Sequence, residues 1–229
     1  MKDIESIDRD EPTSLLPSEI RLCFIRKVYT ILALQLLTSS VICGITLSDP
    51  RMQLFILDNN VLTVSMFTTI GTICAMICYS HKHPWNILLL GMFTIAESFI
   101  LSRTCLIFSA QYGTNIILIS ASMTSGIFLL LTFITFVTNR DFSFMGNMLI
   151  IALFTLIGFM FIQIFTQSVF INTLIAWFGV MIFSGYIIYD TSQILHKLGP
   201  DDCVHASLML YLDIVNIFLL LLNLLRGSD

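Results

Sequence analysis

Two carboxyl groups lie inside segments near the end of the chain that are otherwise apolar. Asp190 stands in the stretch 185–194 (GYIIYDTSQI), and Asp213 stands in 211–216 (YLDIVN), which a leucine-rich run follows. A carboxylate in a membrane-spanning helix costs roughly 2.5–3.5 kcal/mol on insertion scales. Two such costs on neighbouring segments point to a function for the pair.

The two carboxyls have a defined chemistry if they touch. At low dielectric constant both cannot ionise cheaply, so they share one proton. The pair is then a latch that is hydrogen-bonded while one proton remains and repels when both ionise. Ca²⁺ prefers oxygen ligands, so a passing Ca²⁺ can replace the proton, and Asp190 and Asp213 are its predicted transient ligands. The alternative interpretation is structural, with each carboxylate binding helix ends and backbone amides.

Helical spacing gives each aspartate polar neighbours. Asp190 shares a helix face with Tyr186 and Gln193, and Asp213 shares one with Asn216. Polar stripes on otherwise apolar helices face the interior of a bundle or water. We therefore predict that these three polar side chains support the aspartates.

A third acidic residue lies deeper in the membrane. Glu97 stands about 18 Å into an earlier apolar segment at the helical rise. Arg103 follows it on a different helix face, so an ion pair within that helix is poor. The predicted ion pathway and pH sensor consists of Asp190, Asp213 and Glu97.

The composition indicates a membrane protein. Only 11% of the 229 residues are charged, 56% are apolar, and the mean hydropathy is +0.90. Soluble domains carry about 25% charged residues. The net charge of −4 without any basic run excludes nucleic acid as an expected partner.

Seven apolar segments of membrane-spanning length follow a polar tail, and continuous apolar runs favour helices over a β-barrel. The predicted fold is an all-α polytopic membrane protein with a seven-helix bundle. Its predicted parts are a cytosolic tail (1–27), the bundle (28–225) and a short C-terminal tail (226–229). Within the first part, residues 17–19 are expected to start a short amphipathic helix that ends at Arg26 and Lys27. The predicted spans are 28–48, 61–80, 85–103, 114–137, 146–166, 169–190 and 207–225.

The distribution of basic residues predicts a cytosolic N-terminus. With that orientation eight Lys and Arg residues face the cytosol: Lys2, Arg9, Arg21, Arg26, Lys27, Lys82, Arg140 and Lys197. The other side holds Arg51 and Arg103, and also Arg226 if the last segment crosses. A re-entrant last segment would return Arg226 to the cytosol, so the sequence leaves both arrangements open.

The same topology sets the depth of the aspartates. Asp190 precedes Lys197 by about 10 Å of helix, and Asp213 follows His205 by about 12 Å. Both carboxyls are therefore expected at one depth near the cytosolic side, where they can pair.

The six cysteines give a weaker signal. None forms a CxxC motif, and most lie in or beside apolar runs: Cys23, Cys43, Cys74, Cys78, Cys105 and Cys203. Buried thiols are ordinary apolar filler, and a redox or metal role is the lesser interpretation.

The aspartate-bearing stretches 185–194 and 211–216, together with 24–37 (FIRKVYTILALQLL), resemble the transmembrane Bax-inhibitor-motif family. The lifeguard and Golgi anti-apoptotic branch fits best, and the compact tail suggests a poxviral homologue. The resemblance implies a seven-helix bundle in Golgi or endoplasmic reticulum membranes, a pH-sensitive Ca²⁺ leak and suppression of apoptosis. It places the paired-aspartate sensor on Asp190 and Asp213, and an acidic third-helix position on Glu97. Human-like members carry a Glu in the loop before the last segment, where this chain has Asp201 and Asp202, so no role is transferred there.

The leading hypothesis is a Ca²⁺ channel latched by Asp190 and Asp213, with Ca²⁺ as permeant ion and no cofactor. Expected partners are Ca²⁺ and the lipid bilayer, with a second copy of the chain and cell-death or Ca²⁺-release proteins left open. One alternative is an anti-apoptotic regulator that binds proteins without conducting ions. A lesser one is an intramembrane aspartyl protease, but 211–213 (YLD) lacks the Gly-x-Gly-Asp of such enzymes. No catalytic residue is therefore expected.

Overall fold

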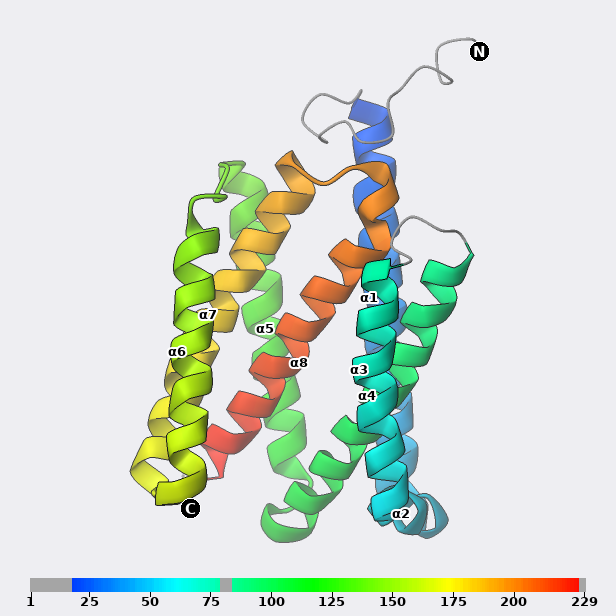
Figure 1. The fold of residues 1–229 in the computed structure, drawn as a ribbon, viewed down its shortest axis with the longest axis vertical. Helices are drawn as coiled ribbons and strands as arrows, with labels where there is room; N and C mark the ends of the chain where they lie inside the picture. Colours follow the sequence, from blue (N-terminus) through cyan, green and yellow to red (C-terminus); the bar gives the residue numbers. More distant parts are fainter. Residues whose placement is uncertain (1–17, 79–83, 227–229) are drawn as a thin grey trace. The chain divides into compact units, whose positions relative to one another are not determined.

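The computed structural model describes residues 18–78 and 84–226, and these contain helices and no strand. The helices are shown in Figure 1: α1 (Ser18–Ser48), α2 (Pro50–Leu57), α3 (Asn59–Cys78), α4 (Trp85–Tyr112), α5 (Asn115–Thr138), α6 (Met145–Thr166), α7 (Val169–His196), the short 3₁₀ helix η2 (Pro200–Asp202) and α8 (Cys203–Leu225). The predicted tail 1–27 lies mostly outside the described residues.

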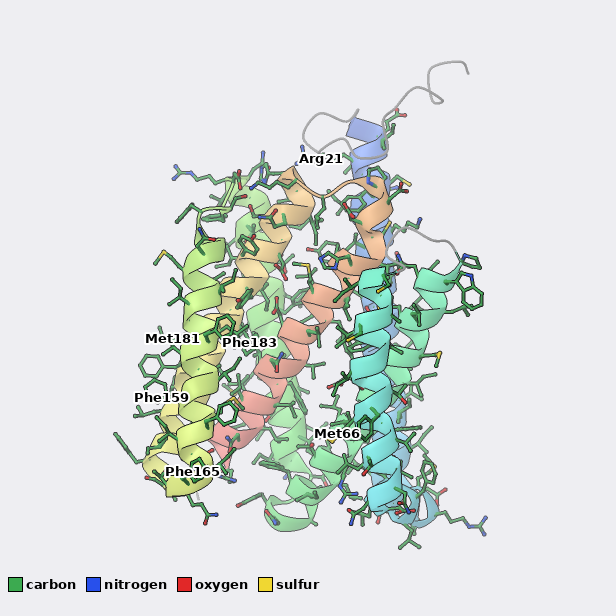
Figure 2. All side chains as sticks on the ribbon, in the orientation of Figure 1. Arg21, Met66, Phe159, Phe165, Met181 and Phe183 are labelled. Carbon is green, nitrogen blue, oxygen red and sulfur yellow. The ribbon has the colours of Figure 1, made fainter. Side chains whose placement is uncertain are left out.

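Seven of these helices, all but α2 and η2, are long and apolar enough to cross a membrane. Their outer faces carry large apolar side chains, as Figure 2 shows for Phe159, Phe165 and Met181. Phe165 is 86% exposed, which suits contact with lipid rather than water. The predicted all-α polytopic fold is confirmed.

The helices form two compact units. Unit 1 contains α1 to α4, η2 and the first part of α8 up to Tyr211. Unit 2 contains α5, α6, α7 and α8 from Leu212 onward. Glu97 therefore belongs to unit 1, while Asp190 and Asp213 both belong to unit 2.

In unit 1, α4 packs against both α1 and α3. The start of α8 joins this group, because the Ser207 hydroxyl donates to the Val28 carbonyl at 3.0 Å. Val28, Phe93 and Tyr211 are fully buried. Unit 1 thus has its own core, to which α8 contributes its first turns.

Helix α2 lies between the predicted spans 28–48 and 61–80, where no helix is expected because the Asp49-Pro50 sequence is typical of a helix break. In the structure Asp49 is the N-cap of α2, and its carboxylate accepts from the Arg51 backbone N–H at 2.9 Å. Proline at the first helical position needs no N–H partner, so Asp-Pro is also a helix start. The segment between the first two spans is therefore helical rather than a loop.

Arg103 of α4 closes the other end of α2. Its guanidinium donates to the carbonyls of Ile56 at 3.0 Å and Leu57 at 2.7 Å, and to Oδ1 of Asn59 at 3.0 Å. The last carbonyls of a helix have no partner within the helix, and a cation there is favourable. Arg103 thus fastens the α2–α3 connection to α4.

Replacing Arg103 with alanine is expected to destabilise the protein by about 1–3 kcal/mol, because charge-assisted hydrogen bonds to helix-end carbonyls are lost. The free energy of unfolding of purified protein in detergent measures this. Arg51→Ala is the matched control, since the Arg51 side chain is exposed on α2. Equal stability of the two variants would contradict the role given to Arg103.

In unit 2, α7 packs against α5 and α6. The core is Ile187 of α7 with Ile217 and Leu221 of α8. At Gly179 a Cβ atom would lie 2.7 Å from Leu220 Cδ1, so a larger residue there requires the Leu220 side chain to move. Side chains of α7 and α8 thus meet in this core, close in sequence to the two aspartates.

Several helix ends differ from the predicted spans. The predicted surface helix ending at Lys27 is part of α1, which runs unbroken from Ser18 to Ser48. Helices α4 and α7 extend to Tyr112 and His196, beyond the predicted ends at 103 and 190. A helix satisfies its backbone hydrogen bonds internally, and this does not depend on whether the side chains are polar or apolar. The helices can therefore continue through the polar residues at these ends.

The last segment is one unbroken helix, not a hairpin. Asn172 and Asn223 exchange two amide hydrogen bonds of 3.0 and 3.1 Å, which place the end of α8 beside the start of α7. The other end of α7 bonds to the α5–α6 loop, where the Phe142 N–H donates to Ser192 Oγ at 2.9 Å. The second half of α8 thus reaches the opposite end of unit 2, as a crossing helix does.

Candidate functional site

The structure brings Asp190 of α7 and Asp213 of α8 together. Their side chains lie within interaction distance of each other, and they are 3% and 5% exposed. Both residues sit on helix faces that the packing of unit 2 turns inward, next to the core residues Ile187 and Ile217. Each carboxyl is therefore held by a continuous helix rather than by a loop.

A hydrogen bond between these two carboxyls requires a proton. Ionised carboxylates only accept hydrogen bonds, so two of them bond to each other only when one is protonated. Asp190 Oδ1 and Asp213 Oδ2 are buried and have no donor among the described residues.

Tyr186 completes the immediate surroundings of the pair. It lies one helical turn before Asp190 and within electrostatic reach of both Asp190 and Asp213. Its ring packs against Phe183, with centroids 6.0 Å apart. Tyr186 is thus a predicted supporting residue that interacts with both carboxyls.

The other predicted supporting residues bond elsewhere. The Gln193 amide donates to Ser143 Oγ at 3.2 Å, in the α5–α6 loop. The Asn216 amide donates to the Leu212 carbonyl of its own helix at 2.8 Å. The Asn216 side chain is only partly buried, and it is placed one turn after Asp213.

The end of α7 beyond the pair is fastened to the α5–α6 loop. Ser192 Oγ donates to the Arg140 carbonyl at 3.3 Å, in addition to its bond from Phe142. In the same loop Asp141 accepts from the Ser143 hydroxyl and backbone N–H. These bonds, with Lys197 and His196 nearby, hold the pKa of Asp141 below its ordinary value. Asp141 thus remains ionised to lower pH than a free aspartate.

Glu97 lies in different surroundings, in unit 1. It is half-buried on α4, within electrostatic reach of Tyr211. The Tyr211 hydroxyl bonds to Ser39 Oγ at 2.8 Å, and Ser39 bonds to Ser98 Oγ at 2.9 Å. The predicted third member of the pathway therefore adjoins a buried hydroxyl network.

This network belongs to a polar seam between α1 and α4 that sequence reasoning missed. Besides the Ser39–Ser98 bond, the Gln35 amide donates to Thr94 Oγ1 at 3.2 Å. The signal was present in the sequence, because polar residues recur every four positions on both helices. Each helix alone resembled an ordinary apolar span, so only the pairing makes the seam visible.

The carboxyl pair can bind a proton or a divalent cation, but it does not form a closed metal site. Within the described ranges no group of three His, Cys, Asp or Glu residues could hold a metal ion. Ca²⁺ in a stable site takes about six to eight oxygen ligands. Two carboxyls therefore suit brief contact with a passing ion better than storage of one.

Comparison with known proteins gives the family. Residues 21–229 match the family model described as inhibitor of apoptosis-promoting Bax1. The chain is 41% identical over 211 residues to the Golgi anti-apoptotic protein of Vaccinia virus (strain Lister), covering 92% of this chain and 87% of that protein. It is 35% identical over 211 residues to protein lifeguard 4 of Mus musculus, with 92% and 87% covered. It is 34% identical over 224 residues to Bax inhibitor 1 of Schizosaccharomyces pombe, with 97% and 83% covered.

The vaccinia relative is named as anti-apoptotic and the yeast relative as a Bax inhibitor, and none of the three names refers to catalysis. The match includes all three stretches on which the predicted resemblance depended, and a poxviral protein is among the relatives, as expected. With seven helices able to span a membrane and a family model matched over nearly its whole length, the chain belongs to the Bax-inhibitor family of apoptosis inhibitors.

Proposed function

We propose that the chain is a pH-sensitive Ca²⁺ leak channel of Golgi and endoplasmic reticulum membranes, which lowers stored Ca²⁺ and thereby inhibits apoptosis. The observation that carries the proposal is the buried Asp190–Asp213 contact. Among the described residues, no Lys, Arg or His acts on either carboxyl. Two buried acids with only each other as partners respond to protons and to divalent cations.

The pair acts as a latch between α7 and α8. While one proton is shared, the hydrogen bond joins the two helices at this point. When the proton leaves, two like charges at short distance in a poorly polar interior repel each other by several kcal/mol, on the order of 4 kcal/mol at 4 Å. The helices separate there, and Ca²⁺ passing through meets two carboxylates in place of the proton. Ca²⁺ flux is therefore expected to rise with pH.

The names of the relatives support the compartment and the outcome. The vaccinia relative is a Golgi anti-apoptotic protein by name, and the yeast relative is a Bax inhibitor. The resemblance implies endoplasmic reticulum membranes as well. The proposed partners are Ca²⁺ and the lipid bilayer, with a second copy of the chain and cell-death or Ca²⁺-release proteins to be tested by cross-linking in membranes.

Purified full-length protein in liposomes loaded with a Ca²⁺ indicator tests the channel directly. We expect Ca²⁺ entry above that of protein-free vesicles, increasing between about pH 5 and about pH 8 as the shared proton is lost. Entry equal to that of empty vesicles at every pH would overturn the proposal. If a variant with both aspartates replaced by asparagine still protects cells from apoptosis, the non-conducting regulator replaces the channel.

A further inference from the structure

One pair of cysteines lies in contact between α1 and α4. Cys43 and Cys105 are far apart in the sequence, yet their side chains lie within interaction distance of each other. Both belong to unit 1. The interpretation of the thiols as apolar filler does not explain why two of the six meet.

The packing register of the two helices accounts for this contact. Helices α1 and α4 run parallel, and the polar seam joins Gln35 to Thr94 and, four residues later on both helices, Ser39 to Ser98. A further step of four residues brings Cys43 to Ser102, beside which it lies. Cys105 follows Ser102 on the same face of α4. The helix backbones, and not a single side-chain rotamer, thus bring the two thiols together.

The two thiols differ in access. Cys105 is 1% exposed, whereas Cys43 is only half-buried. Cys43 lies about 7 Å of helix before the end of α1 at Ser48. An oxidant that reaches it must therefore be small and uncharged, and Cys43 must react first.

The remaining cysteines have other surroundings. Cys23, Cys74 and Cys78 are exposed, and the Cys203 thiol donates to the Pro200 carbonyl. In the described residues, Cys43 and Cys105 are the two thiols that interact with each other. They are therefore the pair in which oxidation can produce an internal cross-link.

We propose that Cys43 and Cys105 form a reversible disulfide that joins α1 to α4, with hydrogen peroxide as the oxidant. Peroxide oxidises the Cys43 thiol to a sulfenic acid and releases one water. The Cys105 sulfur then attacks the Cys43 sulfur, and the sulfenic hydroxyl leaves with the Cys105 proton as a second water. Two thiols are oxidised, one peroxide is reduced to two waters, and a dithiol reductant restores both thiols.

The cross-link is tested on full-length, fully reduced protein in detergent micelles. After treatment with hydrogen peroxide, free thiols are alkylated under denaturing conditions and counted by intact mass. We expect the loss of two of the six thiols, recovery with dithiothreitol, and a Cys43–Cys105 peptide in a non-reducing digest. Because this digest uses the unaltered protein, its result does not depend on whether any variant folds.

Single cysteine variants identify which two cysteines form the disulfide. Cys43→Ser and Cys105→Ser are each expected to keep all remaining thiols, whereas Cys74→Ser is expected to lose two as the unaltered protein does. Retention of all six thiols, a bond mapped to other cysteines or to a second chain, or equal bond formation in denatured protein would each overturn the proposal. None of these readouts depends on Ca²⁺ flux.

Discussion

Replacing Asp213 with asparagine is expected to abolish the pH dependence of Ca²⁺ flux and to hold flux near its low acidic value. Asparagine is close in size to aspartate and donates an N–H to the Asp190 carboxylate, so the contact between α7 and α8 survives without a titrating proton. The repulsion that opens the latch then never develops. A free-energy difference of about 1.4 kcal/mol corresponds to a factor of ten. Losing even part of the repulsion is therefore expected to remove a change in Ca²⁺ flux with pH of about tenfold or more. Flux into liposomes over a pH series measures it.

Asp190→Asn is expected to behave in the same way, because either carboxyl can carry the shared proton. Asp141→Asn is the matched control, since Asp141 lies in the α5–α6 loop and is bonded by Ser143. It is expected to leave the pH profile unchanged. A latch of any kind is ruled out if Asp190→Asn and Asp213→Asn both conduct like the unaltered protein at every pH.

Replacing Tyr211 with alanine is expected to reduce the free energy of unfolding by about 3–5 kcal/mol, the range for removing a large buried aromatic side chain. Tyr211 is completely buried. Its ring packs edge-on against Phe93, with centroids 6.0 Å apart, and its hydroxyl bonds to Ser39 at 2.8 Å. Denaturant titration in mixed micelles measures the loss.

Tyr211→Phe separates the two contributions. It retains the ring and removes only the hydroxyl, so the expected loss is about 0.5–1.5 kcal/mol. Ser39 still bonds to Ser98 and to the Gln35 carbonyl in that variant. If phenylalanine cost as much as alanine, the hydroxyl network rather than ring packing would be the main source of stability in unit 1.

The spans were predictable because membrane helices require long apolar runs, and α3, α5 and α6 differ from the predicted segments by only a few residues. The ends of α4 and α7 were not, because polar residues such as Gln111 and Gln193 continue a helix without continuing its apolar run. Helix α2 was missed because Asp49-Pro50 fits both a break and a start. The N-cap bond to Arg51 decides between these, and only the structure shows it.

The candidate site was predictable only for residues that carry a large free-energy cost in an apolar segment. Asp190 and Asp213 are expensive in an apolar segment, and topology alone placed them at one depth. Gln193 was assigned to the pair by helical phase, but its long side chain reaches Ser143 instead. The contacts between Ser39 and Ser98, and between Cys43 and Cys105, depend on the register of α1 against α4. Small polar residues cost too little free energy inside a membrane helix to stand out in the sequence. The register of α1 against α4 therefore could not be predicted from them.

Infrared spectroscopy of the protonated carboxyl group tests most directly whether the aspartates share a proton. In the unaltered protein at neutral pH we expect a carboxylic acid band that disappears on alkaline titration, in step with rising Ca²⁺ flux. The band is expected to vanish in Asp190→Asn and Asp213→Asn and to persist in Glu97→Gln, whose carboxyl lies in unit 1. Absence of the band at neutral pH, or its persistence in both aspartate variants, would contradict the shared proton and with it the latch.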